Sequence, residues 1–370
     1  MAEIRLEQLA HSYHSAPSEP ADYALRRMEH VWEQGGAYAL LGPSGCGKST
    51  LLNIISGLLT PSEGRVLYDG KSVNDLTPQQ RNIAQVFQFP VVYDTMTVFQ
   101  NLAFPLRNQG HSRERIDLRV REVAEALEIE PLLNRKAQNL TADEKQKVSM
   151  GRGLVRDDVA AILFDEPLTV IDPQLKWRLR RKLKEIHQRF NVTMVYVTHD
   201  QLEASTFADK IAVMYQGQIV QFGTPRELFE NPQHTFVGYF IGSPGMNFLD
   251  ISLGTSGVEF EGRALAVADT IVTQLRQVKA ERLQIGIRPE FVQLVTPENA
   301  ILHGHVDLIQ DQGTFKIVDV CLDTPSARVI KVRIGEEQVV PEGRVGLSFP
   351  AAWQRFYVDD RLVEGTHENL

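Results

Sequence analysis

The sequence predicts two domains: an α/β domain with a mostly parallel, helix-covered sheet over residues 1–242, and an all-β barrel over residues 243–370. Three observations lead to this fold class. Apolar, strand-like runs alternate with helical patterns in the first part, and one of these runs leads into a glycine-rich loop and a helix. Short strand-like runs separated by glycine and proline fill the last part. The length of 370 residues allows two domains, each with its own core.

The composition argues against several classes of protein. A formal net charge of −8 disfavours a nucleic-acid partner, which usually meets a basic face. The two cysteines, Cys46 and Cys321, have no metal-ligand spacing, so we expect free thiols in a cytosolic protein. No apolar run approaches the ~20 residues of a membrane span, and no signal sequence is expected at the N-terminus. Any role at a membrane would therefore depend on partner subunits.

The central motif is a phosphate-binding loop. It matches G-x-x-x-x-G-K-[ST] and consists of Gly42, Pro43, Ser44, Gly45, Cys46, Gly47, Lys48, Ser49 and Thr50. The apolar run 38–41 before it predicts a buried strand, and residues 51–55 after it predict a helix. Loop N–H groups and the helix N-terminus would hold a polyphosphate, Lys48 would reach its β- and γ-phosphates, and Ser49 would bind Mg²⁺. A glycine-rich turn without a ligand is the alternative, and the flanking strand and helix argue against it.

Before and after this loop, the pattern is that of short strands and turns. Residues 4–9 alternate apolar and polar side chains, as in a half-buried strand, and Tyr13 follows its end. An aromatic ring there could stack on adenine, although a surface tyrosine is equally compatible with the sequence. Residues 15–20 predict a loop, and residues 65–70 a short strand that ends in a turn.

A helical insert is expected over about residues 88–155. Residues 82–88 predict a strand that ends in Gln88. Helical periodicity then follows from about residue 98 to 140, and it is clearest at Ile116, Val120, Val123, Ala124 and Leu127. A further helix is predicted to begin at residues 139–144 and to run through Leu154.

Two buried strands are predicted to deliver polar groups at their carboxyl ends. Residues 159–167 form an apolar run that ends in Asp165 and Glu166, and residues 192–200 form one that ends in His199. Ligands collect at such ends in open parallel sheets. Taken singly, the acid pair could mark a turn and the histidine a helix cap or a core position. Between them, residues 175–190 predict a basic amphipathic helix with a solvated face.

The pattern changes over residues 232–244. Four short strand-like runs follow, at residues 283–287, 304–309, 329–333 and 345–349, with glycines and prolines between them. Such runs predict a small β-barrel, with the domain boundary near Gly242.

Taken in order, these motifs resemble the ATP-binding cassette (ABC) ATPases, and the resemblance covers essentially the whole chain. Three details resemble the ATPase subunits of carbohydrate importers, of which the maltose and glycerol-phosphate systems are the best known. These are Val86-Phe87-Gln88 with Met96-Thr97-Val98, the run Phe164-Asp165-Glu166-Pro167-Leu168, and Gly286-Ile287-Arg288-Pro289-Glu290 in the β domain. The last domain resembles the oligonucleotide-type (OB) barrel of these subunits, which serves dimer contact and regulation rather than nucleic-acid binding.

The resemblance implies a role for each site residue. Tyr13 would stack on adenine, and Ser49, Gln88 and Asp165 would complete the shell of Mg²⁺ that accompanies ATP. Glu166 would polarise the attacking water, and His199 would contact the γ-phosphate. The helical insert would dock two membrane permeases at the cytoplasmic face of the membrane, with a solute-binding protein acting indirectly. The solute would be a sugar, a polyol or a glycerol derivative.

One segment departs from the family. The signature Leu-Ser-Gly-Gly-Gln, which faces the partner's γ-phosphate, is replaced by Leu140 followed by Thr141, Ala142, Asp143 and Glu144. Thr141 and Glu144 predict a capping box, which satisfies the helix start internally. A carboxylate ~4 Å from a phosphate charge costs about 4 kcal/mol at an effective dielectric of 20, against ~0.3–1 kcal/mol for a helix dipole. Repulsion wins unless Asp143 turns away. We therefore expect pairing with a different ATPase that carries the usual signature.

The loop after the Asp165 strand also departs, because it reads Leu168-Thr169-Val170-Ile171-Asp172. Asp172 is retained there, so communication across the dimer is expected to survive. Two other readings compete with the importer. A repair or translation ATPase would lack the Gly-Ile-Arg-Pro-Glu barrel, and a regulatory subunit with little hydrolysis would not need Lys48, Asp165, Glu166 and His199 together.

Overall fold

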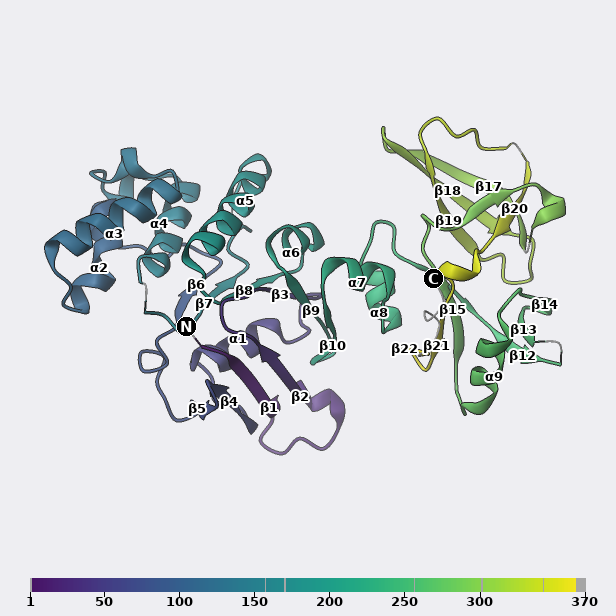
Figure 1. Ribbon diagram of the computed structural model, residues 1–370, viewed down its shortest axis with the longest axis horizontal. Helices are drawn as coiled ribbons and strands as arrows, with labels where there is room; N and C mark the ends of the chain where they lie inside the picture. The colour runs from purple at the N-terminus through teal and green to yellow at the C-terminus, as the bar shows by residue number, and fades with distance from the viewer. Residues whose placement is uncertain are drawn as a thin grey trace. The chain divides into compact units, whose positions relative to one another are not determined.

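The computed structural model describes residues 2–156, 158–169, 171–255, 257–300, 302–341 and 343–363. It divides into two compact units, Met1–Pro225 and Arg226–Leu370, which are described separately (Figure 1). Within the described residues, no helix is both long and apolar enough to cross a membrane.

A six-stranded sheet forms the centre of the first unit, in the order β10-β9-β3-β8-β7-β6. Its strands are β3 (Ala37–Leu41), β6 (Ala84–Val86), β7 (Ile162–Asp165), β8 (Met194–Thr198), β9 (Lys210–Tyr215) and β10 (Gln218–Gly223). All neighbouring pairs are parallel except β10 with β9. Every residue of β3 and β8 is buried, which explains their unbroken apolar sequences. The prediction of a mostly parallel sheet is confirmed.

A second, antiparallel sheet has the order β2-β1-β4-β5. It contains β1 (Ile4–Ser12), β2 (Tyr23–Trp32), β4 (Glu63–Tyr68) and β5 (Lys71–Ser72), and a short 3₁₀ turn (Pro20–Asp22) lies in the expected loop. The helix after the phosphate loop, α1 (Lys48–Ser56), shares one apolar core with both sheets. The sequence predicted β1 and β4 but not β2, whose burial follows no strict alternation.

The helical insert consists of α2 (Val98–Asn108), α3 (Arg113–Ala126) and α4 (Ala142–Leu154), with 3₁₀ turns at Glu130–Leu132 and Ala137–Asn139. Side-chain caps start the three helices: the hydroxyls of Thr97, Ser112 and Thr141 each accept a bond from the backbone N–H three residues on. These caps explain why the helical pattern from about residue 98 to 140 becomes two separate helices, α2 and α3, and why α4 begins where a further helix is predicted.

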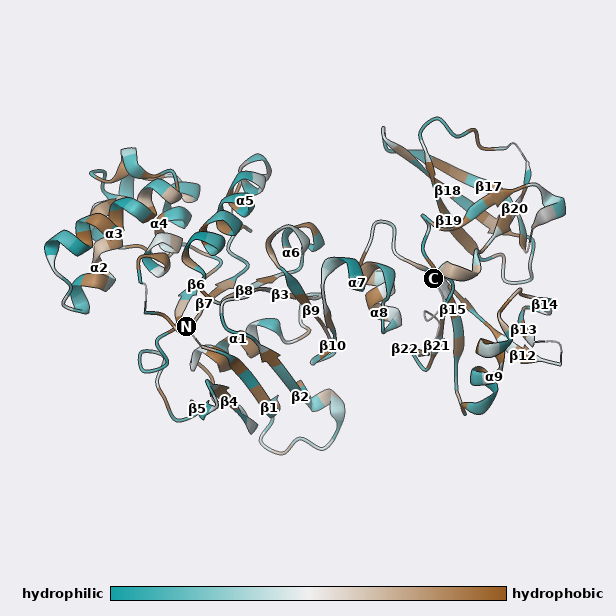
Figure 2. Cartoon of the chain, in the orientation of Figure 1, coloured by the Kyte–Doolittle hydropathy of each residue, from teal (hydrophilic) through white to brown (hydrophobic). Residues whose placement is uncertain are grey.

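Two more helices cover the parallel sheet, α5 (Pro173–Phe190) and α6 (Gln201–Phe207). Helix α5 buries Leu179, Leu183 and Ile186 and exposes Arg181, which pairs with Glu185 at 3.2 Å. The helix is largely hydrophilic in Figure 2. The expected amphipathic helix with a solvated charged face is therefore confirmed.

The second unit begins earlier than the boundary expected near Gly242. Helices α7 (Pro225–Glu230) and α8 (Thr235–Phe240) belong with the β-rich part. Buried Arg288 donates to the carbonyl oxygens of Phe229 and Gly238 at 2.5 and 3.3 Å, and the Tyr357 hydroxyl donates to that of Pro232 at 2.9 Å. These bonds tie the two helices to the strands behind them, and a change in composition along the sequence cannot reveal them.

The strands of the second unit form three antiparallel sheets, ordered β11-β15-β21-β22, β12-β13-β14 and β16-β20-β17-β18-β19. One apolar core joins them. The four predicted runs fall on β15 (Leu283–Ile287), β17 (Leu302–Asp311), β19 (Val329–Gly335) and β20 (Arg344–Ser348). The remaining elements are β11 (Asn247–Asp250), β12 (Ser252–Gly254), β13 (Gly257–Phe260), β14 (Arg263–Ala264), α9 (Asp269–Gln277), β16 (Gln293–Val295), β18 (Phe315–Leu322), β21 (Arg355–Val358) and β22 (Arg361–Leu362), with 3₁₀ turns at Pro297–Asn299 and Ala351–Trp353.

Candidate nucleotide site

The phosphate loop connects β3 to the N-terminus of α1, as the motif requires. Gly47, the N-cap of α1, has φ +103°, and a Cβ there would lie 2.6 Å from the carbonyl oxygen of Ala24. A Cβ on Gly42 would lie 2.3 Å from the carbonyl oxygen of Met214. Because no other residue fits at these two positions, the loop backbone approaches its neighbours closely and leaves its N–H groups at the start of the helix.

Lys48 supplies a positive charge inside this loop. Its side chain is only 6% exposed, and Nζ donates to the carbonyl oxygens of Gly42 and Pro43 at 2.8 and 2.9 Å. Both acceptors are neutral groups of the loop itself. The ammonium charge is thus held in place for an anionic ligand, as the position of Lys48 in the motif predicts.

Ser49 and Asp165 meet beside the loop. The Ser49 hydroxyl donates to Asp165 Oδ1 at 3.4 Å. Burial raises the pKa of Asp165, and the neighbouring charge of Glu166 raises it further. A hydroxyl and a carboxylate are the hard oxygen ligands that Mg²⁺ prefers, and a divalent cation would stabilise the ionised carboxylate. These residues therefore fit a magnesium ion.

Gln88 follows strand β6, which is the neighbour of β7 in the sheet. Val86 of β6 pairs with Phe164 of β7, and Gln88 and Glu166 each lie two residues beyond this pair. The described residues give Gln88 no hydrogen bond to Ser49 or Asp165. Its proposed place in the magnesium shell therefore rests on register alone.

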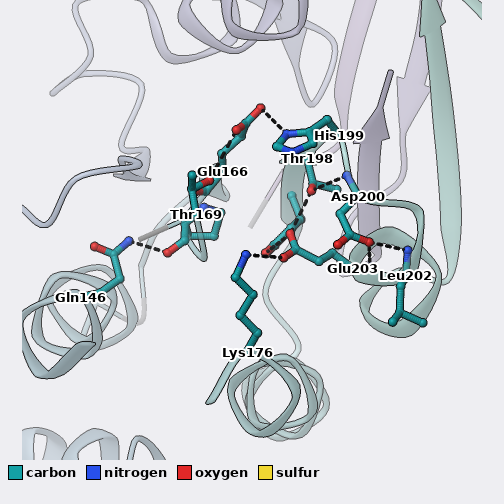
Figure 3. A network of polar contacts seen from close by, with 11 residues as sticks. Gln146, Glu166, Thr169, Lys176, Thr198, His199, Asp200, Leu202 and Glu203 are labelled. Atoms are coloured by element: carbon teal, nitrogen blue, oxygen red, sulfur yellow. Dashed lines mark hydrogen bonds and ion pairs between the residues drawn. The ribbon is translucent and has the colours of Figure 1, made fainter. Parts of the chain in front are cut away.

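Glu166 and His199 form the clearest pair in the site. His199 Nδ1 lies 3.2 Å from Glu166 Oε1, and Figure 3 shows the two side chains directed toward each other. Glu166 has φ +45°, and its backbone N–H donates to the carbonyl oxygen of Val197 at 3.0 Å. This left-handed conformation is uncommon for a residue other than glycine, and it turns the side chain out of the strand end. Because β7 and β8 are parallel neighbours, the polar groups at their carboxyl ends meet at one edge of the sheet.

A buried carboxylate that the sequence reading missed lies behind His199. Glu203 on α6 accepts hydrogen bonds from the hydroxyls of Thr198 and Tyr196 at 2.8 and 3.1 Å, and Lys176 Nζ of α5 lies 3.8 Å away. Asp200 caps α6 by accepting from the backbone N–H groups of residues 202 and 203 (Figure 3). The only available signal was the spacing of acids at a helix start, which resembles ordinary capping.

Tyr13 and Asp172 lie at the periphery of the site. The Tyr13 side chain is 67% exposed, its hydroxyl lies 3.1 Å from Thr50 Oγ1, and its ring meets His11 edge-on. One face of an exposed ring beside the loop suits an adenine partner.

Asp172 caps α5 by accepting a hydrogen bond from the Gln174 N–H at 2.9 Å. Val170, which belongs to the same loop, lies outside the described residues.

Cys46 is a buried free thiol within the loop. Burial raises its pKa, so it stays protonated near neutrality. This agrees with the expectation of a free thiol.

Comparison with known proteins decides the family. A family model described as "ABC transporter" matches residues 25–169, and one described as "MalK OB fold domain" matches residues 242–292. The sn-glycerol-3-phosphate import ATP-binding protein of Bordetella parapertussis is 41% identical over 344 residues, which cover 90% of this chain and 92% of the relative. The chain belongs to the importer ATPases of the ABC transporter family.

Further similarities agree with this assignment. The trehalose/maltose import ATP-binding protein of Thermococcus litoralis is 41% identical over 311 residues, which cover 80% of this chain and 83% of the relative. Among solved structures, cbiO1 from Clostridium perfringens, part of an ABC transporter complex, matches with a TM-score of 0.56 and 27% identity. That match covers 62% of this chain and 90% of cbiO1. The importer ATPase therefore uses Mg-ATP and couples ATP hydrolysis to transport, and its second unit carries an OB-type domain.

The importer ATPase has an unusual start to helix α4. Thr141 and Glu144 form the predicted capping box: the Thr141 N–H donates to Glu144 Oε2 at 2.8 Å, and the Glu144 N–H donates to Thr141 Oγ1 at 3.2 Å. Arg135 Nη1 also lies 3.7 Å from Glu144 Oε1. Two N–H groups at the start of α4, those of Thr141 and Glu144, thus have a partner within the chain.

Asp143 differs from the simplest expectation, in which its carboxylate faces outward. The side chain is half-buried, and Oδ1 is inaccessible and accepts no hydrogen bond from the described residues. Burial raises the pKa of this carboxyl. Asp143 is therefore partly turned inward, so its repulsion of a partner's phosphate is weaker than a fully exposed carboxylate would give. Thr141 and Ala142 remain exposed.

Proposed function

We propose that this importer ATPase forms one half of an unlike ATPase pair that powers uptake of a carbohydrate, a polyol or a glycerol derivative. The observation that carries the unlike pairing is the first turn of α4, where the carboxylates of Asp143 and Glu144 stand in place of the usual signature residues. The solute class follows the names of the relatives, which are import proteins for sn-glycerol-3-phosphate or for trehalose and maltose.

In this proposal, hydrolysis takes place at the chain's own phosphate loop. Lys48 and the loop N–H groups bind the phosphates, and Tyr13 stacks on the adenine. Ser49, Gln88 and Asp165 hold Mg²⁺, which would neutralise charge on the phosphates. The 3.4 Å contact between Ser49 and Asp165 supports two of these three ligands.

Glu166 is the proposed base in this reaction. Its carboxylate would accept a proton from the attacking water, and His199 would orient that water and contact the γ-phosphate. The 3.2 Å contact between the two side chains supports their acting together. Asp172, at the start of α5, would contact the partner ATPase.

The segment Thr141–Glu144 would face the partner's nucleotide. Because Asp143 and Glu144 add negative charge to the first turn of α4, and because neither glycine of the usual signature is present, this segment offers little to a γ-phosphate. A partner ATPase with the usual glycine-containing signature would complete this chain's own site. The partner's nucleotide would then be bound but slowly hydrolysed.

The remaining partners are two transmembrane permeases, which would dock on the helical insert, and an extracytoplasmic solute-binding protein that acts through them. The ATPase would lie on the cytoplasmic face of the membrane, held there by the permeases. Its net charge of −8 argues against a nucleic-acid partner.

The test is to produce the chain with its permeases, once with every ATPase encoded nearby and once alone. Native mass spectrometry should find one copy of this chain and one of another ATPase in the full assembly. The assembly with this chain alone should hydrolyse ATP at least about tenfold more slowly, which corresponds to roughly 1.4 kcal/mol. A self-paired assembly of equal speed would overturn the unlike pairing.

A further inference from the structure

Gln146 lies on α4, one turn beyond the capping box, and is fully buried at 0% exposure. Its amide Nε2 donates to two backbone carbonyl oxygens, that of Phe87 at 3.1 Å and that of Pro167 at 2.9 Å. Figure 3 shows the side chain extending from its helix toward the segment that holds Glu166 and Thr169. Since both acceptors are carbonyl oxygens, the nitrogen of the amide must face them.

The two acceptors adjoin proposed site residues. Phe87 directly precedes Gln88, and Pro167 directly follows Glu166. The strands that lead to them, β6 and β7, are paired in parallel. A single amide therefore spans the exits of two neighbouring strands and links both to the helix that begins at Thr141.

Stability alone is a poor reason for an amide at this position. The other amide atom, Oε1, is buried and accepts no hydrogen bond from the described residues. An unsatisfied buried acceptor costs about 1–3 kcal/mol, which offsets most of the net gain of about 0.5–1.5 kcal/mol from each hydrogen bond made. What the amide does supply is a fixed spacing between the two backbone segments.

The Glu166 turn depends on such support. Glu166 holds φ +45°, a conformation that persists only where its surroundings enforce it. Thr169 Oγ1 donates to the Glu166 carbonyl oxygen at 3.1 Å from within the same turn. Gln146 is a support that comes from another element of the fold, and it acts on the next carbonyl along the chain.

We propose that Gln146 is a positioning residue for ATP hydrolysis: it fixes the Gln88 and Glu166 segments relative to each other and to helix α4. The inference rests on the roles proposed above for Gln88 and Glu166. Movement of α4 when the partner ATPase closes on Thr141–Glu144 would reach both residues through this one side chain.

The test is Gln146→Met in the full transporter assembly, which keeps the side-chain length and removes both donors. ATP binding in EDTA should stay within about twofold, because Gln146 does not contact the phosphate loop. Loss of both hydrogen bonds should lower kcat by roughly 30-fold, which corresponds to about 2 kcal/mol. The Mg²⁺ concentration for half-maximal turnover should rise, because Gln88 is a proposed ligand.

Ser149→Ala is the matched control. Ser149 lies on the same helix, is 7% exposed, and accepts a bond from the Val91 N–H at 3.2 Å, farther from both site residues. It should leave kcat and the Mg²⁺ requirement unchanged. An equal loss in both variants would show general loosening of α4 and would overturn the inference.

Gln146→Leu guards against a failure of the methionine variant to fold. It also removes both donors and buries no charge, so it should also lower kcat while ATP binding in EDTA persists. Wild-type kcat and Mg²⁺ requirement in either variant would overturn the inference. Glu166→Gln separates this result from the proposed function: unchanged turnover there refutes the catalytic assignment itself, whatever Gln146 does.

Discussion

Restoring a glycine-containing signature should raise the ATP turnover of the self-paired importer ATPase. The change is Thr141→Ser, Ala142→Gly, Asp143→Gly and Glu144→Gln, made together. It keeps the capping-box pattern as Ser-x-x-Gln, bares the backbone at the start of α4, and eliminates both carboxylates. In a self-paired assembly, each of these segments would face the partner copy's nucleotide.

The orientation of Asp143 sets the expected size of the effect. At an effective dielectric of 20, a carboxylate repels a phosphate charge by about 4 kcal/mol at ~4 Å and by about 2 kcal/mol at ~8 Å. Because Oδ1 is turned inward, we use the smaller value. A gain of about 2 kcal/mol corresponds to roughly 30-fold in turnover.

The assay is steady-state phosphate release by the self-paired chain reconstituted with its permeases. Asp143→Asn alone tests the charge, and Ala142→Gly alone tests the backbone. If repulsion dominates, Asp143→Asn should recover most of the gain. No gain in the fourfold variant, or a wild-type self-pair that is already as fast, would refute the reasoning.

Three further predictions concern stability. His30 packs edge-on against Trp32 and Phe222, and burial lowers its pKa to about 4 from an ordinary 6.5. The folded state thus favours the neutral form of His30, so the free energy of unfolding decreases as the pH falls from 6.5 toward 4. Between pH 7 and pH 5 this decrease should be about 2 kcal/mol, measured by urea unfolding. His30→Phe should abolish this contribution to the pH dependence. An equal change in unfolding free energy with pH in the variant would contradict the role of His30. Glu203→Leu should lower the unfolding free energy by about 2–4 kcal/mol, because two buried hydroxyls lose their acceptor, whereas Glu203→Gln should cost less than half of that. Arg288→Met should expose residues 228–241 to proteolysis, because four backbone carbonyls lose their donor, and an unchanged digestion pattern would argue against this anchoring.

Much of the active site could be predicted because short-range rules determine it. The strand before the phosphate loop is fully buried, and two loop glycines, Gly42 and Gly47, occupy positions where a Cβ would clash with backbone oxygens. Asp165 and His199 likewise come at the ends of apolar runs that predict buried strands. Because these two strands pair in parallel, their carboxyl ends lie at the same edge of the sheet.

The missed features depend on contacts that the sequence does not display. Gln146 bonds only to backbone carbonyls, so nothing in its sequence context distinguishes it from a surface glutamine. Glu203 resembles a helix-capping acid. The sequence also does not reveal that α7 and α8 belong to the second compact unit, because Arg288, far along the chain, anchors them. Whether Asp143 faced outward could not be decided either, since its burial depends on tertiary packing around α4.

The most direct test of the account is Glu166→Gln in the fully assembled transporter, measured as single-turnover cleavage of bound ATP together with solute uptake. We predict that ATP binds with normal affinity, that cleavage falls at least about a hundredfold, and that uptake stops, as expected on removal of a general base. Unchanged cleavage and uptake would contradict the account and would identify this chain as a regulatory subunit rather than the working ATPase.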